Sequence, residues 1–232
     1  METETDMLKM FDTNVNLTRL GLMRNEDSQI YIDKLRGAGY SIAGRYLRRM
    51  LSDPSCLSAS ECELYLDNGF SIVPVFQHRS NKPELFTVEN GTIDGKAALA
   101  RANDLKIPQE TCIYAAFDCD FTPDTIPAAV AYMRAFALPL RMSGFATGCY
   151  GDSEVLKALL EEEFEDGYSL AEGLWLTNAR GWSQDKTVFN SSVGERWHIR
   201  QSSLPKKPYD GAPFEVDDDE VVDLDIAGAW QP

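Results

Sequence analysis

The stretch that decides the fold is CIYAAFDCD, residues 112–120, where an apolar run ends in two aspartates spaced one residue apart. Side chains alternate along a β-strand, so Asp118 and Asp120 are predicted to share one face. Ile113 and Phe117 fall on the other face, which is apolar as in a strand buried under helices. Acids on the inward face at the carboxyl end of a strand indicate a functional site at the rim of a sheet or barrel.

Strand-like and helix-like patterns alternate on both sides of this stretch. The predicted strands are 8–13, 41–47, 70–77, 112–120, 142–151, 169–177, 195–202 and 221–227, and the predicted helices are 27–40, 57–69, 94–108, 125–139 and 153–167. This alternation, unbroken by a linker, predicts one α/β domain, either an open doubly wound sheet or a closed barrel. The open sheet lacks support for its usual nucleotide site, because there is no GxGxxG after the first strand and no GxxxxGK[ST].

The last quarter of the chain favours a barrel that has lost helices. In ERWHIRQS (195–202), Trp197 shares the inward face with Gln201, while charged or polar residues such as Arg200 occupy the outer face. A polar outer face indicates solvent in place of a covering helix. We therefore predict a single incomplete (β/α)8 TIM-type barrel over residues 1–232, with a core at 8–228, eight strands and about five full helices.

Composition limits the partners of the chain. It carries 37 acidic and 22 basic residues, a formal charge of −15, which argues against nucleic acid as a partner. Two short basic clusters are interpreted as solvated surface; they are Arg45, Arg48 and Arg49, and Lys206 with Lys207. No stretch approaches the roughly 20 apolar residues that span a bilayer, so no membrane insertion is expected.

Cysteine usage and the N-terminal sequence suggest a location inside the cell. The five cysteines show no CxxC spacing, which makes zinc and redox motifs unlikely and favours buried, reduced thiols. We expect no metal and no cofactor. The start METETDMLKM is acidic and lacks the apolar run of a secretory signal. We therefore expect a cytoplasmic protein, or one delivered to the cell wall by a non-classical route such as phage lysis or a secretion system.

Acids at the ends of other strands extend the predicted site. Asp12 ends the first strand, and Asp223 lies on the last predicted strand, which neighbours the first in a closed barrel. Together with Asp118 and Asp120 they would form a cluster in which repulsion separates an acid from a base. Glycoside hydrolysis needs such a pair, and a divalent cation also binds oxygen ligands of this kind. For each acid alone, capping a helix remains an alternative.

Aromatic and amide side chains accompany the acids near the strand ends. Tyr150, Trp175 and Trp197 offer ring faces for stacking on sugars, with core packing as the alternative. Gln77 and Gln201 offer amides for sugar hydroxyl groups or an acetamido group, and ordinary packing is again the alternative. Nucleophile chemistry has little support, because there is no GxSxG and there are only two histidines. The DDDE run at 217–220 is interpreted as a solvated loop.

Several short motifs, taken in order, resemble a known family. They are FDT in the first strand, GRYL at 44–47, LSASE at 57–61, PVFQ at 74–77, DG at 94–95, IYAAFDCD at 113–120, YG at 150–151, LWLT with WS at 182–183, and VDLD at 222–225. The chain resembles, over roughly residues 8 to 228, the glycoside-hydrolase-like domain of unknown function family 1906, related to glycoside hydrolase family 25 lysozymes. The resemblance implies an incomplete (β/α)8 barrel that acts on peptidoglycan.

The resemblance also implies roles for the four acids. Asp12, Asp118, Asp120 and Asp223 match the acids that line the groove of family 25 lysozymes, which cleave the β-1,4 bond after N-acetylmuramic acid. Asp120 stands where that family has the glutamate proposed as general acid, and its side chain is one methylene shorter. A glycosidase on peptidoglycan or a related amino-sugar glycan is the expected function. A catalytically weak or inactive glycan-binding module and a metal-dependent hydrolase are the alternatives.

Overall fold

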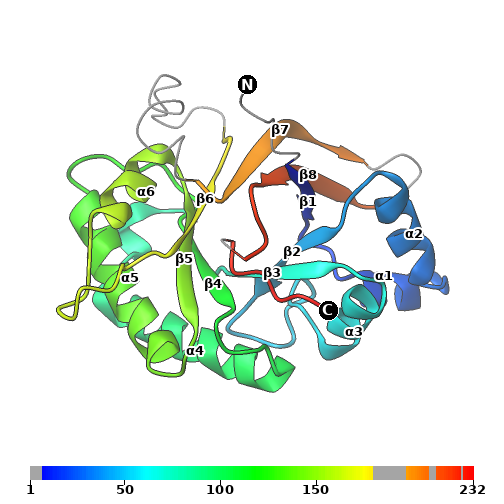
Figure 1. Ribbon diagram of the computed structural model, residues 1–232, viewed down its shortest axis with the longest axis horizontal. Coiled ribbons are helices and arrows are strands. Elements are labelled where there is room, and N and C mark those ends of the chain that lie inside the picture. The colour runs from blue at the N-terminus through cyan, green and yellow to red at the C-terminus, as the bar shows by residue number, and fades with distance from the viewer. Residues whose placement is uncertain (1–6, 180–196, 209–212, 226) are drawn as a thin grey trace.

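The protein is a closed barrel of eight strands in sequence order, as predicted. The computed structural model describes residues 7–179, 197–208, 213–225 and 227–232. Figure 1 shows the strands in the centre, with helices on the flanks. The strands are β1 Leu8–Asp12, β2 Ile42–Leu47, β3 Ser71–Phe76, β4 Cys112–Ala116, β5 Ala146–Gly151, β6 Gly173–Leu176, β7 Ile199–Pro208 and β8 Glu215–Val221.

Six α-helices lie in the described ranges, one more than the five predicted. They are α1 Leu17–Arg24, α2 Gln29–Gly37, α3 Ala59–Asp67, α4 Val88–Leu105, α5 Ile126–Arg141 and α6 Ser153–Leu160, with the 3-10 helix η1 Pro83–Leu85 before α4. The additional helix, α1, begins where the Asn16 side chain accepts a hydrogen bond from the amide of Arg19. None of these helices is long and apolar enough to cross a membrane.

The barrel is mixed, because its last strand runs against its neighbours. Neighbouring strands from β1 to β7 are parallel, whereas β8 pairs antiparallel with both β7 and β1. In the described chain no helix covers β7 and β8, which form the open flank of the barrel in Figure 1. The polar outer face predicted for the seventh strand is thereby explained.

The position of the last strand differs from the prediction at 221–227. The strand is 215–221, and the DDDE run at 217–220, predicted to be a solvated loop, lies inside it. Alternation directs Asp217 and Asp219 to the barrel interior, where both side chains are buried. Acids are tolerated there because the interior is polar toward the mouth. The charge of this run alone wrongly predicted exposure to solvent, because it does not show that the run pairs with neighbouring strands.

The interior of the barrel is filled by large rings set against inward glycines. Tyr114 and Trp175 pack edge to face, with ring centroids 5.9 Å apart. A Cβ at Gly148 would lie 2.6 Å from the Tyr114 ring, and one at Gly44 would lie 2.8 Å from the Trp175 ring. The glycines therefore make room for the two rings. Outside the strands, a second and larger apolar cluster packs under the helices.

The C-terminal segment closes one end of the barrel. The backbone of Trp230 exchanges two hydrogen bonds of 2.8 Å with Ile72 near the start of β3. The amide of Cys112, at the start of β4, donates to the carbonyl of Gly228 at 2.8 Å. The segment thus covers the amino-terminal ends of the parallel strands, and a site must lie at the carboxyl-terminal ends.

All five cysteine side chains are buried, as predicted, and none is in a disulfide. Burial raises the pKa of the Cys62 thiol to about 12 and that of Cys119 to about 12, so the thiolate form is suppressed. These cysteines act as small apolar residues of the core.

Candidate functional site

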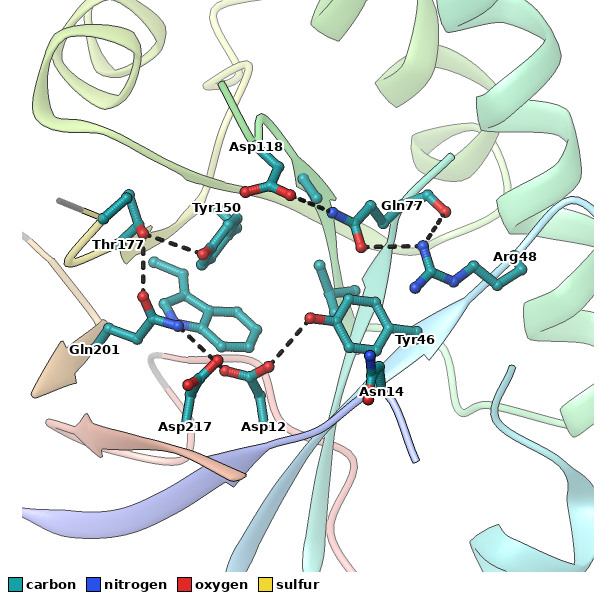
Figure 2. Close-up of a pocket in the computed structure, with 14 residues that line it drawn as sticks. Asp12, Asn14, Tyr46, Arg48, Gln77, Asp118, Tyr150, Thr177, Gln201 and Asp217 are labelled. Atoms are coloured by element: carbon teal, nitrogen blue, oxygen red, sulfur yellow. Dashed lines mark hydrogen bonds between the residues drawn. The ribbon is translucent and has the colours of Figure 1, made fainter. Parts of the chain in front are cut away.

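A pocket of about 470 Å³ opens at the carboxyl-terminal ends of the parallel strands. Each of the eight strands, or the residue or two that follow it, contributes to its lining (Figure 2). The lining consists of Asp12, Asn14, Tyr46, Arg48, Val75, Gln77, Ala116, Asp118, Tyr150, Trp175, Thr177, Ala179, Gln201 and Asp217. The volume and the mixture of rings, amides and acids suit a small part of a polar chain molecule.

Asp12 is held on one wall of the pocket by donors from two other strands. The Tyr46 hydroxyl donates to Asp12 Oδ1 at 3.1 Å, and the Gln201 amide donates to Oδ2 at 3.4 Å. Asp217 is paired with Asp12 across the β1–β8 ladder and lies beside it in Figure 2. These donors stabilise the negative charge of Asp12 where it faces the pocket.

Asp219 lies directly beneath this wall and is fully buried. Its Oδ1 accepts a hydrogen bond from Trp175 Nε1 at 2.9 Å, whereas its buried Oδ2 has no hydrogen-bond partner among the described residues. Burial, followed by the negative charge of Asp12, raises the pKa of Asp219 well above its ordinary value. The raised pKa favours the protonated form of Asp219 beneath Asp12.

Asp118 lies on the opposite wall of the pocket from Asp12 (Figure 2). Gln77 donates from Nε2 to Asp118 Oδ2 at 3.0 Å. Arg48 Nη1 in turn donates to the carbonyl and side-chain oxygens of Gln77, at 2.8 and 3.0 Å. The guanidinium fixes which end of the Gln77 amide faces the acid, so Asp118 receives an oriented donor.

A chain of hydroxyl groups closes the third side of the pocket. Tyr150 donates to Thr177 Oγ1 at 3.1 Å, and Thr177 donates to Gln201 Oε1 at 3.1 Å. Burial, together with Asp12, raises the pKa of Tyr150 and of Tyr46 well above the ordinary tyrosine value. Both phenols therefore stay neutral donors. Gln201, held at its oxygen, presents its amide group to Asp12.

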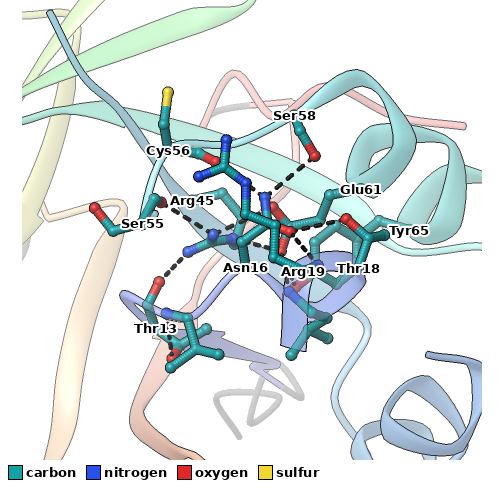
Figure 3. A network of polar contacts seen from close by, with 12 residues as sticks. Thr13, Asn16, Thr18, Arg19, Arg45, Ser55, Cys56, Ser58, Glu61 and Tyr65 are labelled. Carbon is teal, nitrogen blue, oxygen red and sulfur yellow. Dashed lines mark hydrogen bonds and ion pairs between the residues drawn. The ribbon is translucent and has the colours of Figure 1, made fainter. Parts of the chain in front are cut away.

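A buried ion pair anchors the loop that follows β1 (Figure 3). The Arg45 guanidinium binds Glu61 through Nε and Nη2, both at 3.2 Å, and neither side chain is exposed. Arg45 also donates to the Thr13 carbonyl, and Glu61 accepts from the Leu17 amide at 3.0 Å. These contacts hold the residues on both sides of Asn14, which lines the pocket.

The interpretation of the first basic cluster as solvated surface was therefore wrong. Arg45 is fully buried, Arg48 lines the pocket, and Arg49 pairs with the buried Asp94 at 2.5 Å. Arg45 lies within β2 and Arg48 and Arg49 follow its end, and partners from other elements of the fold surround all three. The side chains of Lys206 and Lys207, and the WS motif at 182–183, lie outside the described residues.

Asp223 does not lie on the last strand, and the prediction that placed it there was wrong. Strand β8 ends at Val221, which pairs with Leu8 at the start of β1. Asp223 is therefore exposed at the opposite end of the barrel from Asp12. The reason is strand direction. Because β8 is antiparallel to its neighbours, its first residues, including Asp217, lie at the mouth of the barrel.

Asp120 and Trp197 also lie outside the pocket lining. The strands predicted to contain them have different bounds in the structure and do not include these two residues. β4 ends at Ala116, and the half-buried Asp120 lies in the following loop, where its charge acts on the carboxyl of Asp152 at the start of α6. Trp197 precedes β7, packs against the outer core, and lies 4.8 Å from the guanidinium of Arg200. Asp12, Asp118, Gln77, Tyr150, Trp175 and Gln201 do line the pocket.

Sequence patterns missed Tyr46, Arg48, Thr177, Asp217 and Asp219. Tyr46 has the inward parity of Gly44 in β2, so the alternation used for β4 would have found it. The two acids of β8 could be identified only with the correct bounds of that strand. Arg48 could be identified only from its contact with Gln77, which follows the neighbouring strand β3. In the described part of the chain, no group of three or more His, Cys, Asp or Glu side chains is arranged to hold a metal ion.

Comparison with known proteins finds a curated relative that matches part of the chain and solved structures that share its fold. The curated protein YbfG of Bacillus subtilis (strain 168) is 30% identical over 137 residues, which is 52% of this chain but only 18% of YbfG. The crystal structure of the Mycobacterium tuberculosis Tat-secreted protein Rv2525c in complex with L-tartrate has a TM-score of 0.66 at 18% identity, covering 96% of this chain and 98% of that one.

A solved glycosyl hydrolase and a solved autolysin share the fold at lower identity. A family 25 glycosyl hydrolase from Bacillus anthracis has a TM-score of 0.55 at 8% identity, covering 95% of this chain and 91% of that one. The autolysin LytC of Streptococcus pneumoniae, with a synthetic peptidoglycan ligand, has a TM-score of 0.52 at 11% identity, covering 93% and 46%. At these identities the likeness establishes the fold.

A family model decides the membership. The model described as "Rv2525c-like, glycoside hydrolase-like domain" matches residues 33–221, which include all the strands except β1. The match agrees with the resemblance carried by the sequence motifs and with the TIM-like barrel shared with the family 25 hydrolase. This chain belongs to the Rv2525c-like, glycoside hydrolase-like domain family.

Proposed function

We propose that the protein is a glycoside hydrolase that cleaves a β-1,4 bond in peptidoglycan or a related amino-sugar glycan. One observation carries the proposal: the carboxyl groups of Asp12 and Asp118 face each other across a single pocket (Figure 2). Glycoside hydrolysis needs two carboxyl groups on either side of the scissile bond. The Tyr150 ring is part of the same lining and is a surface on which a sugar can pack, whereas the Trp175 ring is almost fully buried beneath the pocket.

The environments of the two acids suggest different roles. Asp12 accepts from the Tyr46 hydroxyl and the Gln201 amide, so its negative charge is well stabilised. It is suited to stabilise the positive charge that develops on the sugar ring. In the described chain the Gln77 amide donates to Asp118, whereas two donors hold Asp12, and we assign to Asp118 the protonation of the leaving oxygen or the positioning of the acetamido group of the substrate.

The choice of glycan draws on the neighbours. LytC was crystallised with a synthetic peptidoglycan ligand, and the Bacillus anthracis enzyme is a family 25 glycosyl hydrolase. Both share the barrel of this chain. The amides of Gln77 and Gln201, on opposite sides of the pocket, are the groups we expect to contact acetamido and hydroxyl groups of the bound sugars.

The test is release of reducing ends and soluble muropeptides from purified peptidoglycan. We expect release by the wild type and loss by Asp118→Asn, which keeps the size of the side chain. Asp120→Asn is the matched variant: an acid of the same loop that lies outside the pocket lining is expected to affect release much less. Loss of release in Asp120→Asn alone would transfer the acid role to Asp120.

A glycan-binding module without hydrolytic activity is the second candidate. It is favoured by Asp120, which stands where the related lysozymes carry glutamate and does not line the pocket. For this candidate we expect pelleting of the protein with purified walls but no release of reducing ends across pH. Binding that Tyr46→Phe and Asp118→Asn both leave intact would contradict a glycan site in this pocket.

A further inference from the structure

Two small recesses adjoin the pocket on the side of β2 and β3. The first, of about 150 Å³, shares Arg48 with the pocket and includes His78. The second, of about 70 Å³, shares His78 with the first and adds Arg49, Arg79 and Ser80. Through these shared lining residues the three cavities lie in a row, called here the path, that leads from the pocket to Arg49 and Arg79.

Several donors along this path have no protein partner among the described residues. Arg48 uses Nε for Ser55 and Nη1 for Gln77, which leaves its Nη2 uncommitted. The side chains of His78 and Arg79 make no hydrogen bond or ion pair within the described chain. The hydroxyl of Ser80, a residue only 6% exposed, is buried and has no hydrogen-bond partner there. A buried hydroxyl without a partner is costly and points to a ligand.

The charged residues that line the two recesses are three arginines and two aspartates, namely Arg48, Arg49, Arg79, Asp53 and Asp94. Asp94 is engaged by Arg49 at 2.5 Å and by the Tyr132 hydroxyl at 2.9 Å. Asp53 accepts from the amide and hydroxyl of Ser55. The uncommitted groups are therefore cationic or neutral donors, although the chain as a whole has a formal charge of −15. Such a local reversal of sign concentrates anionic groups.

Arg48 is also held rigidly in place. Its guanidinium lies 4.5 Å from the centre of the Tyr46 ring, and its bonds to Gln77 and Ser55 fix its plane. The Nη2 edge is thus oriented in advance at the point where the pocket meets the first recess. A guanidinium held this way binds a carboxylate or phosphate at a small cost in side-chain entropy.

We propose that these recesses form an anion subsite, in which Arg48, His78, Arg79 and the Ser80 hydroxyl bind a carboxylate or phosphate group carried by the glycan. The proposal rests on the proposed glycan site and adds to it a substrate class: a glycan with an acidic substituent beside the bond that lies between Asp12 and Asp118.

The test measures affinity, which keeps it independent of hydrolysis. Isothermal titration would compare thio-linked disaccharides that resist cleavage: N-acetylglucosaminyl-N-acetylmuramic acid, its methyl amide, and di-N-acetylchitobiose with and without a 6-phosphate. We expect the charged member of at least one pair to bind roughly tenfold more tightly than its neutral partner at low salt. The pair with the larger ratio of charged to neutral affinity shows whether the bound anion is a carboxylate or a phosphate.

Variants of residues without protein partners assign the effect to the subsite. In Arg79→Gln and in His78→Gln/Arg79→Gln the charged-to-neutral ratio should fall to about twofold or less. Lys157→Gln, which removes one positive charge from the exposed face of α6, should keep the wild-type ratio. The ratio should also shrink as salt is raised, because the rim is partly exposed.

Two results would overturn the proposal. One is equal affinity for charged and neutral members of both pairs in the wild type, and the other is a charged preference that survives in the double variant. A protein that binds these disaccharides but releases no reducing ends from purified peptidoglycan would lose only the enzymatic part of the proposed function. If none of the disaccharides binds, the proposed glycan site is refuted, and this subsite is refuted with it.

Discussion

Replacing Asp219 by asparagine should stabilise the protein, and increasingly so as the pH rises. The asparagine oxygen can accept from Trp175 Nε1, as Asp219 does at 2.9 Å, and its neutral amide group occupies the place of the buried Oδ2. The hydrogen bond of the folded state is therefore kept. What changes is the unfolded state, which can no longer ionise at this position.

The magnitude follows from proton linkage. Burial and the charge of Asp12 raise the pKa of Asp219 in the folded state well above the ordinary value of 3.8. Between those two pKa values the folded wild type keeps a proton that the unfolded chain releases, so its stability falls as the pH rises. The fall is about 1.4 kcal/mol for each pH unit. Asp219→Asn lacks this loss, and the two proteins should have similar stability below about pH 4.

Urea unfolding at intervals of one pH unit between 4 and 8 measures the difference. Asp67→Asn, at the exposed end of α3, is the matched control and should follow the wild type in parallel. Two results would refute the reasoning: a constant difference between Asp219→Asn and wild type at all pH values, or a variant that becomes relatively less stable toward neutral pH. Either would mean that Asp219 is ionised in the folded protein.

Three further substitutions test the site and its support. Tyr46→Phe removes a donor to Asp12, and glycan cleavage should fall roughly ten- to a hundredfold with no change in thermal unfolding. Glu61→Gln leaves the buried Arg45 guanidinium without its counter-charge, and urea unfolding should show a loss of about 3–5 kcal/mol. Gly44→Ala puts a methyl group within 2.9 Å of three interior side chains, so unfolding should show a loss of about 1–3 kcal/mol.

Local patterns predicted the parts of the fold that depend on neighbours in sequence. In β4 the predicted alternation is confirmed, because Tyr114 packs inside the barrel while Ile113 packs under the helices. The polar outer face of the seventh strand correctly indicated a flank without a helix. Helix boundaries were less certain: α4 begins after Thr87, whose hydroxyl accepts from Asn90, and not at Asp94.

Asp94 shows why such boundaries escape a local analysis. An aspartate before an apolar run is typical of a helix cap, but here it lies inside α4 and is buried. Its partners, Arg49 and Tyr132, come from a β2 loop and from α5. A buried carboxylate within a helix is stable only with such partners, and they are distant in sequence.

Residue type and order were enough to predict the strands of the parallel part of the barrel, the inward position of Asp12 and Asp118, and the family. Which further residues join the two acids depends on contacts between distant parts of the chain. The antiparallel direction of β8 brings Asp217 to the mouth and leaves Asp223 at the far end. Direction is set by pairing across the barrel, and no periodicity in a single strand records which neighbour it pairs with or which way it runs.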